Sequence, residues 1–299
     1  MRSLSCIAVL AVEMIALALS VSGNMFIIVT NLLAWTKNKT FNLSDQLITW
    51  ISVSNVFFVL LRLISNLIYE KVNQAFYIML HLALIFCNLW FCAWLTTYFC
   101  LKINNLCNRF YISLQRRLYK IFPWIPIPSV LVALLVSLPV ALFRPEKILP
   151  SKADNDSVSH ILTYSSNFIV SFLIYGTFST LAFFFSGYSI MNIVMSLYRH
   201  IKNMQGNIRG FRGSNVEVHV RAVKTVISVL SFNVILFTVN AVTVFYIDDM
   251  SILYYSSIST SFIHFLCSVI LINGNCNLSK SLRTLRNSVC CLCTRYSSK

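Results

Sequence analysis

The residues of this chain that could carry out chemistry lie mostly inside long apolar segments. Glu13, Arg62 and His81 each place an ionisable side chain within such a segment, where charge is costly and usually serves binding, pairing or transport. The sequence patterns His-Glu-x-x-His, Gly-x-Ser-x-Gly and the Walker loop do not occur in the 299 residues. No residue at metal-ligand spacing accompanies His81. We therefore expect no enzyme activity, no cofactor and no metal site.

Polar residues recur at spacings that return to one face of a helix. The series, in chain order, are Glu13, Ser20, Asn24 and Asn31; Asn55, Arg62 and Asn66; His81, Asn88 and Cys92; Tyr175, Ser179 and Ser186; Asn233 and Asn240; and Ser257, Ser261, His264 and Ser268. Within a membrane such faces turn toward the interior of a helix bundle. They serve either as hydrogen bonds between helices or as the lining of a ligand cavity.

Glu13 and Arg62 are the two charges most clearly placed within apolar segments, on segments that follow one another in the chain. An unpaired charge in that environment would be expensive. We therefore expect an ion pair between them, either direct or bridged by water. The alternative is that Arg62 extends its charged end to the outer lipid headgroups.

The overall composition indicates a membrane protein. Hydrophobic residues make up 57% of the chain and charged residues only 11%, and the mean hydropathy is +0.73, whereas a soluble domain has about 25% charged residues. Runs of about 20 apolar residues cross about 30 Å of hydrocarbon. Such runs cover residues 7–34, 46–67, 77–101, 123–143, 166–197, 223–247 and 252–275. The sequence predicts an all-α membrane protein, with a single seven-helix domain over 1–299 that ends in a short basic tail at 276–299.

The net charge of +15 also indicates a membrane rather than a nucleic-acid partner. The basic residues lie in short breaks between apolar runs, not on one folded face with interleaved aromatic residues. Segments 37–45, 102–122, 198–224 and the tail hold 18 of the 24 Lys and Arg residues but only two of the nine acids. Because basic loops stay in the cytoplasm, we expect an extracellular N-terminus, a cytoplasmic C-terminus and a place in the plasma membrane.

Cysteines and glycosylation motifs fit that orientation. The predicted outer loop at 144–165 contains no Cys and so cannot be tied by a disulfide. Asn155 begins an Asn-Asp-Ser motif in the same loop and is the expected glycosylation site. Cys290, Cys291 and Cys293 lie in the basic tail, where they are suited to palmitoylation or remain reduced thiols.

Motifs at the inner ends of the segments resemble those of one receptor family. Residues 196–205 read Ser-Leu-Tyr-Arg-His-Ile-Lys-Asn-Met-Gln, residues 219–228 read His-Val-Arg-Ala-Val-Lys-Thr-Val-Ile-Ser, and residues 268–278 read Ser-Val-Ile-Leu-Ile-Asn-Gly-Asn-Cys-Asn-Leu. They resemble the patterns S-L-W-x-H-x-x-x-M-Q, H-V-K-A-L-K-T-V-I-S and S-F-I-L-I-x-G-N-x-K-L of bitter-taste receptors, the type 2 taste receptor family of G-protein-coupled receptors. Gly-Asn-Met-Phe-Ile at 23–27 and Tyr-Phe-Cys-Leu-Lys-Ile-Asn-Asn at 98–105 agree.

The departures from the family pattern identify a divergent member. The family's second-helix Arg is replaced by Asn55, its fifth-helix Pro falls on Ala182, its seventh-helix His is Cys267, and its first-helix acid lies about one turn early, at Glu13. The intramembrane contacts that accompany activation in the family are therefore expected to differ here.

The resemblance implies a small, largely apolar bitter compound bound in the extracellular half of the bundle. The corresponding positions are Asn66, His81, Leu82, Ile85, Tyr175, Phe178, Asn240, Ser257, Thr260 and Ser261. It also implies a gustducin-like heterotrimeric G protein bound at the cytoplasmic face, which carries Lys102, Arg116, Arg117, Arg199, His200, Lys202, Arg221 and Lys224. These charges alternatively serve only to set topology and to contact anionic lipid.

Two other functions remain open at this point. Vomeronasal type-1 receptors are also short-looped and seven-helical, but they usually keep a Cys pair between the third helix and the second outer loop, which residues 144–165 cannot supply. The other alternative is a non-signalling membrane carrier of hydrophobic small molecules.

Overall fold

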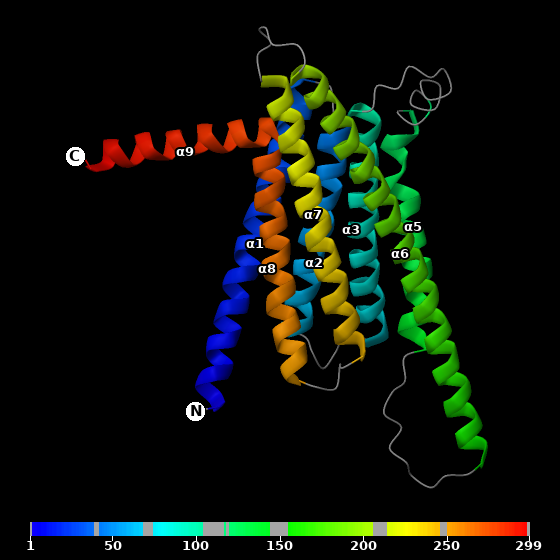
Figure 1. The fold of residues 1–299 in the computed structure, drawn as a ribbon. Coiled ribbons are helices and arrows are strands. Elements are labelled where there is room, and N and C mark those ends of the chain that lie inside the picture. Colours follow the sequence, from blue (N-terminus) through cyan, green and yellow to red (C-terminus); the bar gives the residue numbers. More distant parts are fainter. Residues whose placement is uncertain are drawn as a thin grey trace.

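Long α-helices make up nearly all of the described chain. The computed structural model describes residues 2–38, 42–67, 74–103, 117, 120–143, 155–205, 214–245 and 250–297. The helices are α1 (Arg2–Asn38), α2 (Leu43–Leu67), α3 (Gln74–Ile103), α5 (Pro126–Leu142), α6 (Asn155–Gln205), α7 (Ser214–Phe245), α8 (Met250–Gly274) and α9 (Cys276–Ser297), with a 3-10 turn, η1 (Phe122–Trp124), before α5 (Figure 1). Because no water reaches the hydrocarbon core, a spanning segment must satisfy its backbone hydrogen bonds internally, as these helices do.

Length and composition give six candidate spans within the described residues, and seven when a bent helix pair is counted as one. Six helices, α1, α2, α3, α5, α6 and α7, are long and apolar enough to cross a membrane. The seventh candidate is α8, which passes the same test together with the start of α9 across a bend of 97°. The structure thus agrees with the all-α, seven-helix class that the sequence predicts.

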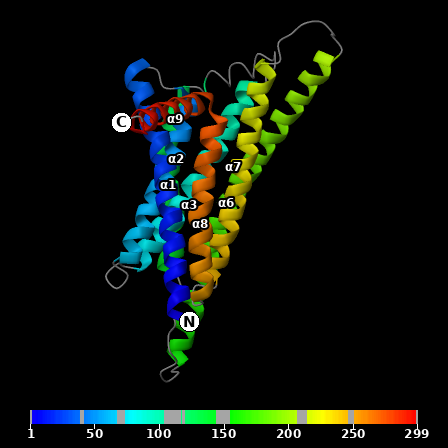
Figure 2. The same cartoon turned by 90° about the vertical axis from the view of Figure 1, so that its left-hand side faces the viewer.

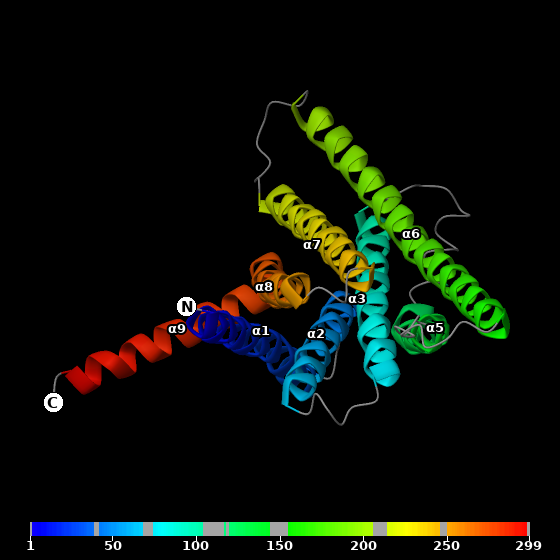
Figure 3. The same cartoon turned by 90° about the horizontal axis from the view of Figure 1, so that it is seen from below.

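The spans form one bundle around α3. That helix contacts α2, α5, α6 and α7, while α1 packs between α2 and α8 (Figure 3). The first residues of α1 lie at one end of the bundle, which we call the N-terminal end (Figure 1). The opposite end, the α9 end, is where α9 leaves the bundle nearly at a right angle to the spans (Figures 1 and 2).

The bundle buries polar side chains among its apolar core and exposes many apolar side chains on its outer surface. Asn24 and Asn55 have no exposed surface, whereas Phe184 and Tyr188 on α6 are more than 70% exposed. Lipid tails are as apolar as these exposed side chains, so the outer surface gains nothing from being covered by protein. The interior instead collects the polar faces predicted from the sequence.

Several helices extend beyond the predicted apolar runs. The fifth run was expected at 166–197 and the sixth at 223–247, but α6 spans Asn155–Gln205 and α7 begins at Ser214. Hydropathy marks only the part of a helix that lies in hydrocarbon, whereas its backbone hydrogen bonds continue into polar flanking residues. For the same reason the tail, predicted only as a basic segment, contains the additional helix α9.

Two glycines allow helices to approach closely. A methyl group added at Gly23 on α1 would overlap the Oγ atom of Ser268 on α8. A methyl group at Gly274, the last residue of α8, would overlap the side chain of Thr225 on α7. Small residues at helix interfaces are typical of membrane bundles, since they let backbones pack against each other. These two contacts fix α8 between α1 and α7.

The Gly23 contact yields a prediction. Gly23→Ala is expected to cost about 1–3 kcal/mol through overpacking and so to lower the melting temperature of the purified protein. Gly23→Ala with Ser268→Ala should recover part of the loss, because the nearest atom is removed. Gly187→Ala is the matched control, since a methyl group there meets nothing within 4 Å. Equal melting temperatures for Gly23→Ala and Gly187→Ala would contradict the close packing.

Candidate ligand-binding site

A cleft opens between three helices in the half of the bundle nearer the N-terminal end. Its lining residues are Leu82 and Ile85 of α3, Phe172 and Tyr175 of α6, and Phe237, Asn240 and Ala241 of α7. Leu82 is eight residues from the start of α3, which at about 1.5 Å per residue places it roughly 12 Å along the helix. Its free space is about 10 Å³, room for about one water molecule.

The cleft is apolar with two polar side chains. The Tyr175 hydroxyl donates a hydrogen bond to the carbonyl oxygen of Leu82, at 3.2 Å. Asn240 Nδ2 donates to the carbonyl oxygen of Leu236 in its own helix, at 2.7 Å. Both side chains are buried. A few oriented polar groups within an apolar wall are typical of small-molecule sites.

Four of the ten sequence-predicted ligand positions lie in this cleft: Leu82, Ile85, Tyr175 and Asn240. Of the other positions whose side chains the structure describes, none lines it. Phe178 is 39% exposed on α6, and Thr260 and Ser261 are buried on α8. The side chains of Asn66 and Ser257 lie outside the described residues.

Three lining residues were missed from the sequence. Phe172 and Phe237 lie three positions before Tyr175 and Asn240, one helical turn away, and Ala241 follows Asn240 directly. The sequence analysis searched for polar faces, and these residues are apolar like most of their surroundings. Extending each polar face by one turn on its own helix would have found the two phenylalanines.

His81, also among the predicted ligand positions, lies in an aromatic cluster. Its ring centroid is 4.8 Å from that of Phe58 and 5.8 Å from that of Tyr77. The ring of His264 lies on Phe58 as well, at 4.6 Å. No group of three or more potential metal ligands occurs among the described residues. In this structure both histidines therefore contribute aromatic packing around Phe58.

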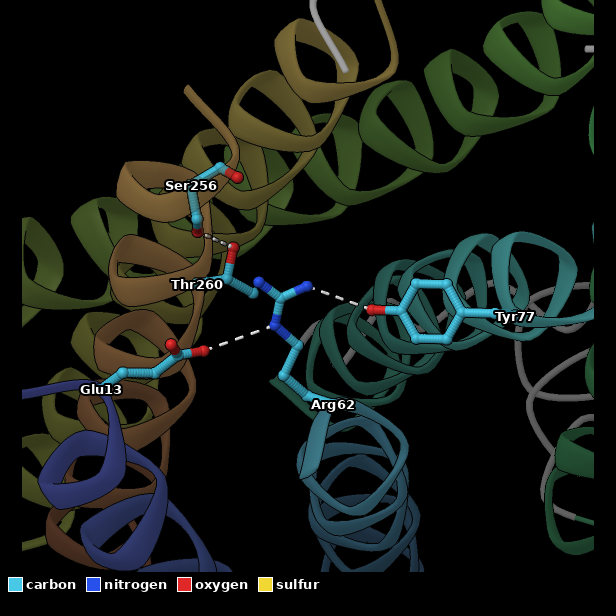
Figure 4. A network of polar contacts seen from close by, with 5 residues as sticks. All are labelled: Glu13, Arg62, Tyr77, Ser256 and Thr260. Atoms are coloured by element: carbon cyan, nitrogen blue, oxygen red, sulfur yellow. Dashed lines mark hydrogen bonds and ion pairs between the residues drawn. The ribbon is translucent and has the colours of Figure 1, made fainter. Parts of the chain in front are cut away.

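Glu13 and Arg62 lie in contact near the N-terminal end (Figure 4). Arg62 Nε is 3.4 Å from Glu13 Oε1, and the side chains are 16% and 4% exposed. Arg62 Nη1 also donates to the Tyr77 hydroxyl at 3.2 Å. The sequence left open a direct pair, a water-bridged pair or an Arg62 that reaches the outer lipid headgroups. The structure has the two side chains in direct contact. The network ties α1, α2 and α3 together beside Ser256 and Thr260 of α8 (Figure 4).

Deeper in the bundle, three buried asparagines form a ladder. Asn88 Nδ2 donates to Asn55 Oδ1 at 2.5 Å, and Asn55 Nδ2 donates to Asn24 Oδ1 at 3.1 Å. Asn24 Nδ2 in turn donates to the carbonyl oxygen of Ser20 at 2.8 Å. Asn55, at the position where the resembled family has Arg, is thus the central member of an uncharged ladder across α1, α2 and α3.

The predicted cytoplasmic positions can be placed only in part. Lys102, Arg117, Arg199 and Lys224 are exposed, and Lys102 Nζ lies 5.7 Å from the centroid of the Tyr98 ring. Positions that fall outside the described residues, or whose side chains do, are Arg116, His200, Lys202, Arg221, Cys290, Cys291 and Cys293. The side chain of Asn155, the predicted extracellular glycosylation site, lies outside them as well. Lys102, Arg199 and Lys224 belong to α3, α6 and α7, the three helices that also form the cleft.

The comparison with known proteins decides the family. A model of the taste receptor protein family (TAS2R) matches residues 1–289. The chain belongs to this family. It is similar to taste receptor type 2 member 10 of Homo sapiens and of Pan troglodytes, each 28% identical over 284 residues that cover 91% of both chains. It is also similar to taste receptor type 2 member 114 of Mus musculus, 29% identical over 296 residues with the same coverage.

The family confirms the resemblance found in the motifs. The receptor is a multi-pass membrane protein and a G-protein-coupled receptor of the bitter-taste family.

The ion pair yields a second prediction. Glu13→Arg and Arg62→Glu each place two like charges in contact, and breaking a buried pair costs about 3–5 kcal/mol. Each single variant should therefore lose surface expression, and the double reversal should recover it. Lys37→Glu, an exposed charge reversal on α1, serves as the control. A double variant that reaches the surface no better than either single variant would count against direct pairing.

Proposed function

We propose that the receptor binds small, largely apolar bitter compounds in the cleft and activates a gustducin-like heterotrimeric G protein. The observation that carries the proposal is the cleft itself. Its walls contain Leu82, Ile85, Tyr175 and Asn240, four of the ligand positions taken from the family resemblance. An apolar wall with two polar side chains suits uncharged ligands of varied shape at modest affinity.

The cleft must widen before it can hold a ligand. Its free space of about 10 Å³ is far below the roughly 300–1,000 Å³ of common small-molecule pockets. Phe172 and Phe237, on opposite helices of the cleft, are the bulky side chains that can turn aside. A ligand that separates them pushes α6 and α7 apart. It therefore binds more tightly when these helices are farther apart, and it shifts the conformational equilibrium toward that arrangement.

We further propose that the N-terminal end is extracellular and the α9 end cytoplasmic, in the plasma membrane. The excess of Lys and Arg in the segments of the α9 end supports this orientation. It makes Asn155 an extracellular glycosylation site and gives Cys290, Cys291 and Cys293 access to palmitoylation.

The same three helices connect the ligand and the G protein in this proposal. α3, α6 and α7 line the cleft at one end and carry Lys102, Arg199 and Lys224 toward the other. A change in their separation at the cleft therefore alters the spacing of these basic side chains. Together with Arg116, Arg117, His200, Lys202 and Arg221, they form the proposed G-protein-binding face. Membership of the taste receptor family sets aside the vomeronasal alternative.

The proposal predicts ligand-dependent nucleotide exchange. Membranes that contain the receptor should accelerate GTP binding to a purified gustducin-like α-subunit with at least one compound of a broad bitter panel. Membranes without the receptor provide the blank. A receptor that reaches the surface and binds panel compounds, yet produces no exchange on any α-subunit tested, would favour the non-signalling carrier.

The position of the ligand is tested by filling the cleft. Ala241→Phe adds a ring to a lining position and should raise the half-maximal agonist concentration at least about tenfold, which corresponds to about 1.4 kcal/mol. Val242→Phe is the matched control, because Val242 is the next residue and is 43% exposed on the outer surface. Equal agonist responses of the two variants, at equal surface expression, would place the ligand elsewhere.

A further inference from the structure

The junction between α8 and α9 is built around one asparagine. Asn275 separates the two helices where the chain bends by 97°. Its Oδ1 atom accepts hydrogen bonds from the backbone N–H groups of Asn277, at 2.9 Å, and Leu278, at 3.4 Å. These are bonds of an N-cap residue, which satisfies the free N–H groups at the start of a helix. Asn275 therefore begins α9.

The other end of the same amide reaches α2. Asn275 Nδ2 donates to Asp45 Oδ1 at 2.6 Å, across 230 residues of sequence. Asp45 is the only acidic residue of α2 and lies in its first turn. Its carboxylate thereby lies beside the start of α9, where the helix dipole favours negative charge.

Asp45 is in turn connected to α1. Asn31, which is buried on α1, donates through Nδ2 to the carbonyl oxygen of Asp45 at 3.2 Å and to Thr49 Oγ1 at 2.9 Å. Thr49 Oγ1 donates to the same carbonyl oxygen at 2.7 Å. A continuous set of polar contacts thus runs from α1 through α2 to the start of α9.

The surroundings leave the junction little freedom. Leu278, in the first turn of α9, has no exposed surface. On the opposite side, Gly274 packs against Thr225 of α7 with no room for a side chain. Farther along α9, Lys280, Arg283 and Arg286 are exposed. Where these charges lie relative to the rest of the α9 end depends on the direction in which Asn275 starts the helix.

We propose that Asp45 and Asn275 are a positioning pair that holds α9 against α1 and α2 and so sets where its basic side chains lie. Neither residue is assigned contact with a ligand or a G protein. Any signalling consequence rests on the proposed function, but the position of α9 does not.

The test measures that position directly. Spin labels are introduced as unnatural amino acids at Lys37, on α1, and Ser288, on α9, both exposed, because ten native cysteines preclude thiol labelling. The distance distribution between the labels is recorded by electron spin resonance for the full receptor without ligand, in phosphatidylcholine nanodiscs. A pH of about 8 prevents two facing carboxylates from sharing a proton.

Asn275→Asp is expected to broaden the distribution, because two carboxylates then face each other across the 2.6 Å contact. Asn275→Asp with Asp45→Asn should restore the narrow wild-type distribution, since an aspartate is also a good N-cap and the amide introduced on α2 can donate to it. Asn277→Asp is the matched control: it adds the same charge two residues later, at an exposed position, and should leave the distribution narrow.

Three outcomes would overturn the proposal. One is a wild-type distribution for Asn275→Asp, and another is a double variant as broad as Asn275→Asp alone. The third is equal broadening by Asn277→Asp, which would assign the effect to charge at the start of α9. None of these depends on an agonist or a G protein, so the proposed function can fail while the positioning pair stands, and the reverse.

Discussion

The structure depends on the cost of polar groups in hydrocarbon. Every backbone N–H and C=O within the bilayer must find a partner in the protein, which makes each span a helix. The same cost turns polar side chains inward, where they pair with one another rather than with lipid. Glu13 with Arg62, and the ladder of Asn88, Asn55 and Asn24, are the results of this constraint.

These polar contacts are arranged at successive depths along α1, α2 and α3. The ion pair lies near the N-terminal end, the asparagine ladder lies deeper, and Asp45 with Asn275 joins the same side of the bundle at the α9 end. They hold α1 and α2 to their neighbours along much of their length. The cleft, by contrast, lies between α3, α6 and α7, and its walls are mainly apolar. Apolar contacts are less directional than hydrogen bonds, so this side of the bundle is the one suited to rearrangement around a ligand.

The uncharged ladder distinguishes this chain from the family pattern. A buried Arg needs a compensating anion, whereas an amide both donates and accepts and can form a chain without any net charge. With Asn55 at the second-helix position, the deep part of the bundle needs no acid, and the one ion pair found among the described residues lies nearer the N-terminal end, at Glu13 and Arg62. Of the two departures that the motif resemblance indicates, Asn55 is a member of the ladder and Glu13 a member of the ion pair outward of it.

The sequence alone determined the class, the family and the buried faces. Seven apolar runs must be helices in a membrane, and a spacing of 7 or 11 residues places Glu13, Ser20 and Asn24 on one side of a helix whatever its neighbours are. Only the tertiary structure decided which faces meet. Phe172 and Phe237 line the cleft, whereas Phe178 does not. Asn275 donates a hydrogen bond to Asp45, which lies 230 residues away in the sequence. Periodicity fixes the direction of a side chain within its own helix, but not the rotation and depth of the helix that packs against it.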